Sequence, residues 1–164
     1  MAKQKDEKTN VMRILEQKNI PYTAHAYPHE DGVAVDGVTV AQSLGQDPEC
    51  VFKTLVARGA SKGIYVFAIP VAESLDLKKA AKAVGEKSIA MIPQKELLPL
   101  TGYVHGGCSP VGMKKQFHTV FHETVILFDT ICVSAGKIGA QVEVAPDALI
   151  ALLDADTADV VVDA

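Results

Sequence analysis

A lysine lies on the side of a predicted strand that is otherwise apolar. In Val51-Phe-Lys-Thr-Leu-Val-Ala57 successive side chains point to opposite faces, so Lys53 shares its face with Val51, Leu55 and Ala57. One interpretation is that its methylene stem covers the core while its ammonium reaches solvent. The other is an ammonium at the mouth of a concave site, where an anion or a developing oxyanion offsets the cost of desolvation.

A glycine-rich segment, Gly102-Tyr-Val-His-Gly-Gly-Cys-Ser-Pro-Val-Gly112, is the second unusual feature. So many glycines lose backbone entropy on folding, which ordinary turns or a close approach of the backbone to another group can offset. If the segment is a substrate loop, the N–H groups of Gly106 and Gly107 lie against a carbonyl or a phosphate. The segment Val133-Ser-Ala-Gly-Lys-Ile-Gly139 repeats the combination of serine, glycine and lysine after a predicted strand.

Nucleophilic side chains are present, but no catalytic partner for them is evident. Cys108, Ser109 and Ser134 lie in these two segments without a Gly-x-Ser-x-Gly signature around them. Cys50 and Cys132 are expected to be buried structural residues. Because the three cysteines are widely spaced and lack a Cys-x-x-Cys pair, neither a disulfide scaffold nor a zinc finger is predicted, and a reducing compartment fits best.

Two histidine pairs have i,i+4 spacing, His25 with His29 and His118 with His122. On a helix that spacing can supply two zinc ligands. Pro28 interrupts the first pair, and the second lies among β-forming residues without the glutamate of a His-Glu-x-x-His motif. We therefore expect no metal site, and solvent-exposed or hydrogen-bonded histidines instead.

The elements that must position these residues alternate along the chain. Hydrophobic periodicity, caps and turn residues predict short helices near residues 10–15, 39–44, 76–85, 93–99 and 146–153. Runs of β-branched and aromatic residues predict strands at 22–27, 51–57, 64–69, 88–92, 119–121, 124–128, 131–134, 141–144 and 160–162. Clustered strands with inserted helices predict a mixed α/β fold, either a mostly antiparallel curled sheet or a barrel of six to seven strands with helices outside.

The composition is typical of one domain spanning residues 1–164. With 48% hydrophobic residues, the chain can bury roughly 70% of its unfolded surface without disulfides or a structural metal. The N-terminus is polar and no apolar run approaches the roughly 20 residues of a membrane helix, so we expect a cytoplasmic protein. A formal net charge of −4 excludes a surface that binds nucleic acid throughout, although lysine clusters such as Lys114 with Lys115 can hold RNA weakly.

Together these segments resemble the YbaK/EbsC family of trans-acting aminoacyl-tRNA editing proteins, in particular its YbaK branch, the Cys-tRNA(Pro) deacylases. The similarity extends from Thr9 to the final predicted helix. Its most specific parts are Val51-Phe-Lys-Thr-Leu, Pro70-Val-Ala-Glu-Ser-Leu-Asp-Leu-Lys-Lys79, Thr101-Gly-Tyr-Val-His-Gly-Gly-Cys-Ser-Pro110 and Val133-Ser-Ala-Gly-Lys-Ile-Gly139.

The resemblance implies a mixed β-barrel with a pocket at its mouth and cleavage of a mischarged tRNA ester without a metal or other cofactor. It assigns catalysis to Lys53. Substrate binding is assigned to Tyr27, Gly106, Gly107 and Ser134, to which we add Ser109 in the same loop. Three positions depart from the family pattern: Cys108 replaces a frequent aliphatic residue, Ala135 a glycine, and Gln141 an aspartate found in some members.

The favoured hypothesis is therefore removal of cysteine from tRNA(Pro), with the substrate's own thiol attacking the ester carbonyl. The resemblance also implies prolyl-tRNA synthetase as a partner, and neither DNA nor a membrane is expected to be one. Two alternatives remain open. One is an editing enzyme for Ala- or Ser-tRNA, and the other is a noncatalytic module that uses the same pocket to hold a small ligand or a synthetase surface.

Overall fold

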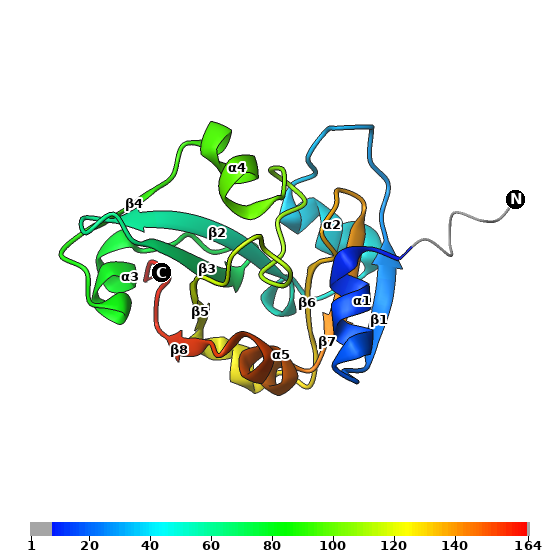
Figure 1. The fold of residues 1–164 in the computed structure, drawn as a ribbon. Coiled ribbons are helices and arrows are strands. Elements are labelled where there is room, and N and C mark those ends of the chain that lie inside the picture. The colour runs from blue at the N-terminus through cyan, green and yellow to red at the C-terminus, as the bar shows by residue number, and fades with distance from the viewer. Residues whose placement is uncertain (1–7, 164) are drawn as a thin grey trace, which may run out of the picture.

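The computed structural model describes residues 8–163 and shows a mixed α/β fold with two sheets (Figure 1). The three-stranded sheet is antiparallel, with the spatial order β1 (Tyr22–Ala26), β7 (Ala140–Val144) and β6 (Ile131–Ser134). The five-stranded sheet has the order β4 (Ile89–Met91), β2 (Phe52–Gly59), β3 (Ile64–Pro70), β5 (His118–His122) and β8 (Asp156–Ala158). Only the pairs β3–β5 and β5–β8 are parallel, so the mainly antiparallel arrangement is as predicted.

The predicted alternative of a closed barrel is wrong. A barrel requires every strand to pair with a neighbour along a continuous ladder. Here, within the described part of the chain, one parallel bridge between Val51 and Cys132 joins the two sheets, just before β2 begins. The strands β1, β6, β4 and β8 remain sheet edges. The two sheets therefore meet at one corner instead of closing on each other.

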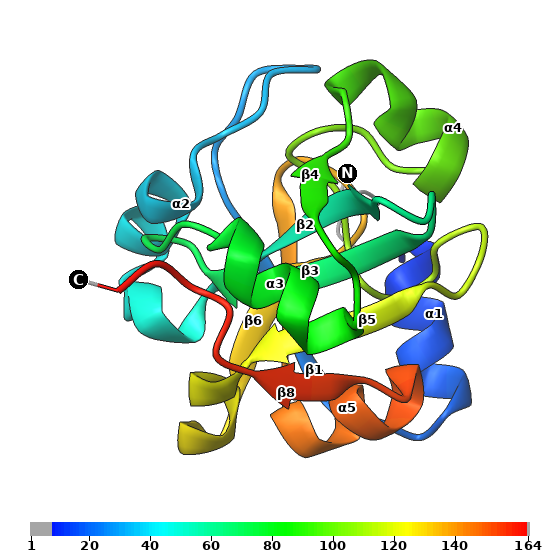
Figure 2. The ribbon, with the colours of Figure 1, turned by 90° about the vertical axis from the view of Figure 1, so that its left-hand side faces the viewer.

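Short helices surround the two sheets (Figure 2). They are α1 (Asn10–Gln17), α2 (Gly37–Leu44), α3 (Leu77–Val84), α4 (Leu97–Thr101) and α5 (Pro146–Leu153), with the 3-10 helices η2 (Pro48–Cys50), η3 (Gln94–Glu96) and η4 (Glu123–Leu127). The predicted caps are present, because the side chains of Thr9 and Asp76 accept hydrogen bonds from the first turns of α1 and α3. Among the described residues, no helix is both long and apolar enough to cross a membrane.

Two predicted strands are replaced by other structure. Residues 124–128 mostly belong to η4, in which Val125 is buried while Ile126 and Leu127 are largely exposed. The packing of Val125 against the core overrides the β-propensity of this segment. At the C-terminus, the last strand lies at β8, and the predicted strand 160–162 makes only one bridge, between Val161 and Leu75.

The two largest core clusters are built around different helices, and the larger cluster contains residues of both sheets. One cluster packs α1 and α5 against the three-stranded sheet through fully buried residues such as Val11, Leu15 and Leu149. A second packs α3 against the five-stranded sheet around Phe67 and Ile69. Burial of this apolar surface is the main driving force that fixes both sheets.

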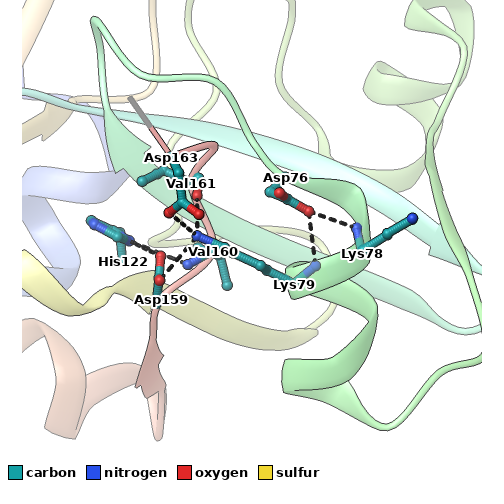
Figure 3. Close-up of polar contacts among 8 residues, drawn as sticks. All are labelled: Asp76, Lys78, Lys79, His122, Asp159, Val160, Val161 and Asp163. Carbon is teal, nitrogen blue, oxygen red and sulfur yellow. Dashed lines mark hydrogen bonds and ion pairs between the residues drawn. The ribbon is translucent and has the colours of Figure 1, made fainter.

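The C-terminal segment 159–163 is bound to α3 and β5 (Figure 3). The Lys79 ammonium donates to three acceptors in this segment, which are the Asp159 carboxylate at 3.0 Å, the Val161 carbonyl at 2.8 Å and the Asp163 carboxylate at 2.7 Å. The buried His122 ring accepts a hydrogen bond from the Val160 N–H through Nδ1, at 3.3 Å. This acceptor role places the ring proton of neutral His122 on Nε2.

Candidate active site

A pocket of about 370 Å³ lies where the two sheets meet. Its walls come from β2, from β6 and β7, from the start of α2 with the loop before it, and from the glycine-rich loop. Four of the six site residues predicted from the sequence line this pocket: Tyr27, Lys53, Gly106 and Ser134. The other two, Gly107 and Ser109, belong to the glycine-rich loop but do not line the pocket.

The Lys53 side chain is partly buried at the pocket wall. Burial lowers the pKa of Lys53 below its ordinary value of 10.5, and the nearby carboxylates of Asp36 and Glu73 oppose this shift. No described residue forms a hydrogen bond or an ion pair with the ammonium. The pocket therefore contains a partly desolvated cation with donors available to an oxygen of a ligand.

Thr54 is a pocket residue that the sequence reasoning missed. Its Oγ1 is buried and has no hydrogen-bond partner among the described residues, although Thr54 lines the pocket beside Lys53. A buried hydroxyl without a partner is costly, so a ligand that reached Oγ1 and completed its hydrogen bonding would gain affinity. The sequence carries no signal for this role, because strand alternation places Thr54 on the opposite face from Lys53.

One face of the three-stranded sheet forms the polar side of the pocket. Ser134 on β6 is directly opposite Gln141 on β7, and both line the pocket together with Tyr27. The buried Gln141 amide exchanges two hydrogen bonds with that of Gln46, at 2.8 and 3.2 Å, which fixes its orientation. The Ser134 Oγ accepts from the Gly136 N–H at 3.1 Å, so its own proton can be donated to a ligand.

The glycine-rich loop approaches the pocket at Gly106. This residue has a φ of +89°, and a Cβ added to it would lie 2.6 Å from the Cβ of Ala34. Only glycine satisfies both the left-handed backbone and this close approach. The Gly106 N–H makes no hydrogen bond within residues 8–163, so it can serve as a donor in the pocket.

Gly107 and Ser109 stabilise the glycine-rich loop from within. The Gly107 N–H donates to the Val104 carbonyl at 3.0 Å and is therefore already used in a turn. A Cβ on Gly107 would lie 2.9 Å from the Cα of Lys137, so the two glycine-containing segments pack against each other here. Ser109 is fully buried, and its Oγ accepts from the Val111 N–H at 3.2 Å.

The pocket contains no activated nucleophile among the described residues. Burial raises the pKa of the Cys108 thiol to about 12, so this pocket-lining cysteine stays protonated near neutral pH. No imidazole or carboxylate of the described chain forms a hydrogen bond with Ser134. Both side chains therefore lack the base that nucleophilic catalysis requires.

The donors are suited to an oxygen that gains negative charge. The Lys53 ammonium and the Gly106 N–H can both donate hydrogen bonds within one partly apolar pocket, where such interactions are stronger than in water. Such a pocket is suited to a carbonyl compound or an anion, whose negative charge these two donors can stabilise.

Comparison with known proteins identifies the family to which this chain belongs. Residues 33–152 match the family model described as the aminoacyl-tRNA editing domain. A protein of Enterococcus faecalis, provisionally named Cys-tRNA(Pro)/Cys-tRNA(Cys) deacylase EbsC, is 45% identical over 162 residues, covering 98% of both chains. The chain belongs to the aminoacyl-tRNA editing family, and the resemblance to its YbaK/EbsC members is confirmed.

Solved structures share the fold. A crystal structure provisionally described as a trans-editing enzyme for prolyl tRNA synthetase has a TM-score of 0.79 and 26% identity, covering 93% of this chain and 95% of that one. A structure of a hypothetical protein has a TM-score of 0.82 at 21% identity, covering 93% and 99% of the two chains, and supports the fold alone.

Proposed function

We propose that this protein is a deacylase that removes cysteine from Cys-tRNA(Pro). The observation that carries the proposal is the pocket itself, which combines the Lys53 ammonium and the Gly106 N–H and has no activated nucleophile among residues 8–163. The name of the Enterococcus relative supports this substrate. An aminoacyl ester is already activated, so orientation and oxyanion stabilisation are enough for its cleavage if the substrate brings its own nucleophile.

The proposed reaction is an intramolecular displacement. The cysteine sulfur of the substrate forms a bond to its own ester carbonyl carbon, and the carbonyl oxygen becomes a transient oxyanion. When the carbon–oxygen bond to the ribose breaks, the released ribose oxygen takes the proton that the thiol gave up and becomes the free hydroxyl of the tRNA. Cysteine leaves as a thiolactone, which water then opens. Esters of alanine and proline lack the thiol and cannot follow this route.

Each pocket residue has a role in this proposal. Lys53 and the Gly106 N–H stabilise the oxyanion, while Ser134 and Tyr27 orient the aminoacyl group. Gly107 and Ser109 act indirectly, because their polar groups already bond within the loop and keep it in place. Cys108 forms part of the wall without reacting.

The cellular setting follows from this substrate. The protein acts as one editing domain in the cytoplasm, where tRNA is charged. An acidic chain with few lysine clusters holds tRNA weakly by itself. Prolyl-tRNA synthetase, which holds the mischarged tRNA, is the proposed partner.

The test is deacylation of a panel of tRNAs carrying cysteine, serine or alanine, with and without prolyl-tRNA synthetase. Cys-tRNA(Pro) should react fastest, and Ser-tRNA(Pro) far more slowly. A thiol with a pKa near 8.5 is a few per cent thiolate at neutral pH, whereas an alcohol is essentially un-ionised. Equal rates for the cysteinyl and seryl esters would show that water or a protein group attacks the carbonyl.

The assay also separates the alternatives. Faster release of alanine or serine than of cysteine would identify another editing specificity. Binding without deacylation of any ester would identify a noncatalytic module. An acyl group trapped on Cys108, with an inactive Cys108→Ser variant, would replace substrate assistance by covalent catalysis.

A further inference from the structure

The polar face of the three-stranded sheet continues beyond the pocket into a cluster of metal-ligating side chains. His25 on β1, Cys132 on β6 and Glu143 on β7 bring their ligand atoms within 4.8 Å of one another. They share one face because Cys132 is directly opposite Glu143, and His25 is opposite Gln141, two residues away. The cluster combines nitrogen, sulfur and oxygen donors from three strands.

Contacts around the cluster hold two of the ligands in place. The His25 Nε2 and the Glu143 Oε1 are 2.8 Å apart. The second Glu143 oxygen accepts a hydrogen bond from the Thr130 hydroxyl. This outer contact is of the kind that orients metal-binding carboxylates. Cys132 is 4% exposed, and its side chain makes no hydrogen bond to any described residue.

We propose that His25, Cys132 and Glu143 bind one thiophilic divalent cation of the zinc type, with water as the fourth ligand. Zinc prefers this donor set, with bonds of about 2.0–2.3 Å to the three atoms. The ion can enter after small side-chain rotations. These rotations lengthen the contact between His25 and Glu143 and bring the three ligand atoms to bonding distance of the metal. The Cys132 thiol loses one proton to solvent, and neutral His25 binds through Nε2 with its proton on Nδ1.

The site is separate from the pocket chemistry. Tyr27, Ser134 and Gln141 form the pocket end of the sheet face, whereas none of the three metal ligands lines the pocket. The bound ion cross-links β1, β6 and β7 and stabilises the folded state. At a free zinc concentration 100-fold above Kd, the melting temperature should rise by about 5–10 °C. The deacylation rate should not depend on EDTA.

Metal titration of the full-length protein tests the proposal without an activity assay. Cobalt(II) serves as the spectroscopic probe, and zinc displaces it. We expect one cobalt per chain with a thiolate-to-cobalt charge-transfer band. Cys132→Ser should abolish the band. Thr130→Val keeps all three ligands and should weaken binding roughly 10- to 100-fold.

Two other cysteines provide matched controls. Cys50 adjoins the bridge beside Cys132, and Cys108 is buried in the pocket wall, so Cys50→Ser and Cys108→Ser should keep the band. Circular dichroism establishes that each variant is folded. A folded wild-type protein that binds no cobalt or zinc would overturn the proposal. A band that survives in Cys132→Ser, or that is lost in Cys50→Ser or Cys108→Ser, would overturn the ligand assignment.

Discussion

The proposed catalytic role of Lys53 places a demand on this side chain that is opposite to the demand of stability. Lys53→Met should lower kcat/KM for Cys-tRNA(Pro) by about 10²–10³-fold, the usual effect of losing one oxyanion donor. Because the ammonium is partly desolvated, its removal should leave the melting temperature unchanged or raise it. The exposed Lys82 on α3 supplies the control, since Lys82→Met should alter neither quantity. Near wild-type turnover in Lys53→Met would show that the site assignment is wrong.

The lowered pKa of Lys53 determines whether stability rises or falls with increasing pH. Its pKa in the folded protein lies below 10.5, so the unfolded chain binds more protons between the two values. Stability from this group therefore rises as the pH increases through that window, while oxyanion stabilisation by the ammonium is lost.

Thr54 offers a test in which stability and activity separate. Thr54→Val replaces a buried hydroxyl without a partner, so unfolding experiments should show equal or greater stability. If the substrate hydrogen-bonds to Oγ1, kcat/KM should fall about 2- to 10-fold. Thr124 on η4 is the matched control, because its Oγ1 is also buried without a partner but lies outside the pocket. Thr124→Val should change stability in the same direction as Thr54→Val and leave kcat/KM unchanged. If Thr54→Val also leaves kcat/KM unchanged, the substrate does not contact Thr54 Oγ1.

The sequence could indicate some site residues and not others for a physical reason. Lys53 is noticeable because a charge on an apolar strand face is unusual, and Gly106 because glycines are costly without a structural need. The role of Thr54 depends on missing partners, which only the folded arrangement shows. Similarly, His25 pairs with Glu143, 118 residues away, and not with His29 at the helical spacing.

At the scale of structural elements, two glycine variants can distinguish the effect of backbone strain from the effect of close packing in the glycine-rich loop. Gly106→Ala introduces a side chain at a φ of +89° and a clash with Ala34, so both stability and kcat/KM should fall. Gly45→Ala, at the end of α2, has a φ of +66° with nothing within 4 Å of the added Cβ. It should cost about 1 kcal/mol of stability and leave kcat/KM unchanged. Equal kinetics for the two variants would argue against an active role for the loop.

The C-terminal segment provides a second element to test. His122→Phe leaves the buried Val160 N–H without its acceptor, which costs about 1–3 kcal/mol. The melting temperature should fall by several degrees, and hydrogen exchange should accelerate in residues 159–163. His118→Phe places the same substitution at the more exposed end of β5 and should have a smaller effect. Unchanged exchange in His122→Phe would show that this hydrogen bond does not hold the segment.

Local patterns predicted elements well where cap, periodicity and burial agree. Asp76 and Gly85 mark both ends of α3 as expected. Prediction failed at η4, where β-branched residues form a 3-10 helix because one of them anchors to the core. The prediction of a barrel was wrong for a related reason, since the sequence pattern of a strand does not reveal whether that strand stays unpaired at the edge of a sheet.

At the scale of the whole molecule, charge limits how the protein meets its substrate. The formal net charge is −4, so long-range attraction to tRNA is weak and any positive contact must be local. In the proposed function the pocket recognises only an aminoacyl group, which is a small part of a charged tRNA. Selection of tRNA(Pro) therefore requires a second recognition surface, which we propose is supplied by the synthetase.

A few local phosphate contacts predict a shallow salt dependence of tRNA binding by the protein alone. With two or three phosphate contacts, affinity for Cys-tRNA(Pro) should fall about 10- to 50-fold between 50 and 200 mM salt, against 10³–10⁵-fold for six to ten contacts. Adding prolyl-tRNA synthetase should raise kcat/KM, most strongly at the higher salt, because the synthetase raises the local tRNA concentration. Fluorescence titrations of labelled tRNA and deacylation rates across the same salt series measure both effects. A steep slope with tight binding by the protein alone would show that it carries its own extended tRNA surface, and the synthetase would then be unnecessary.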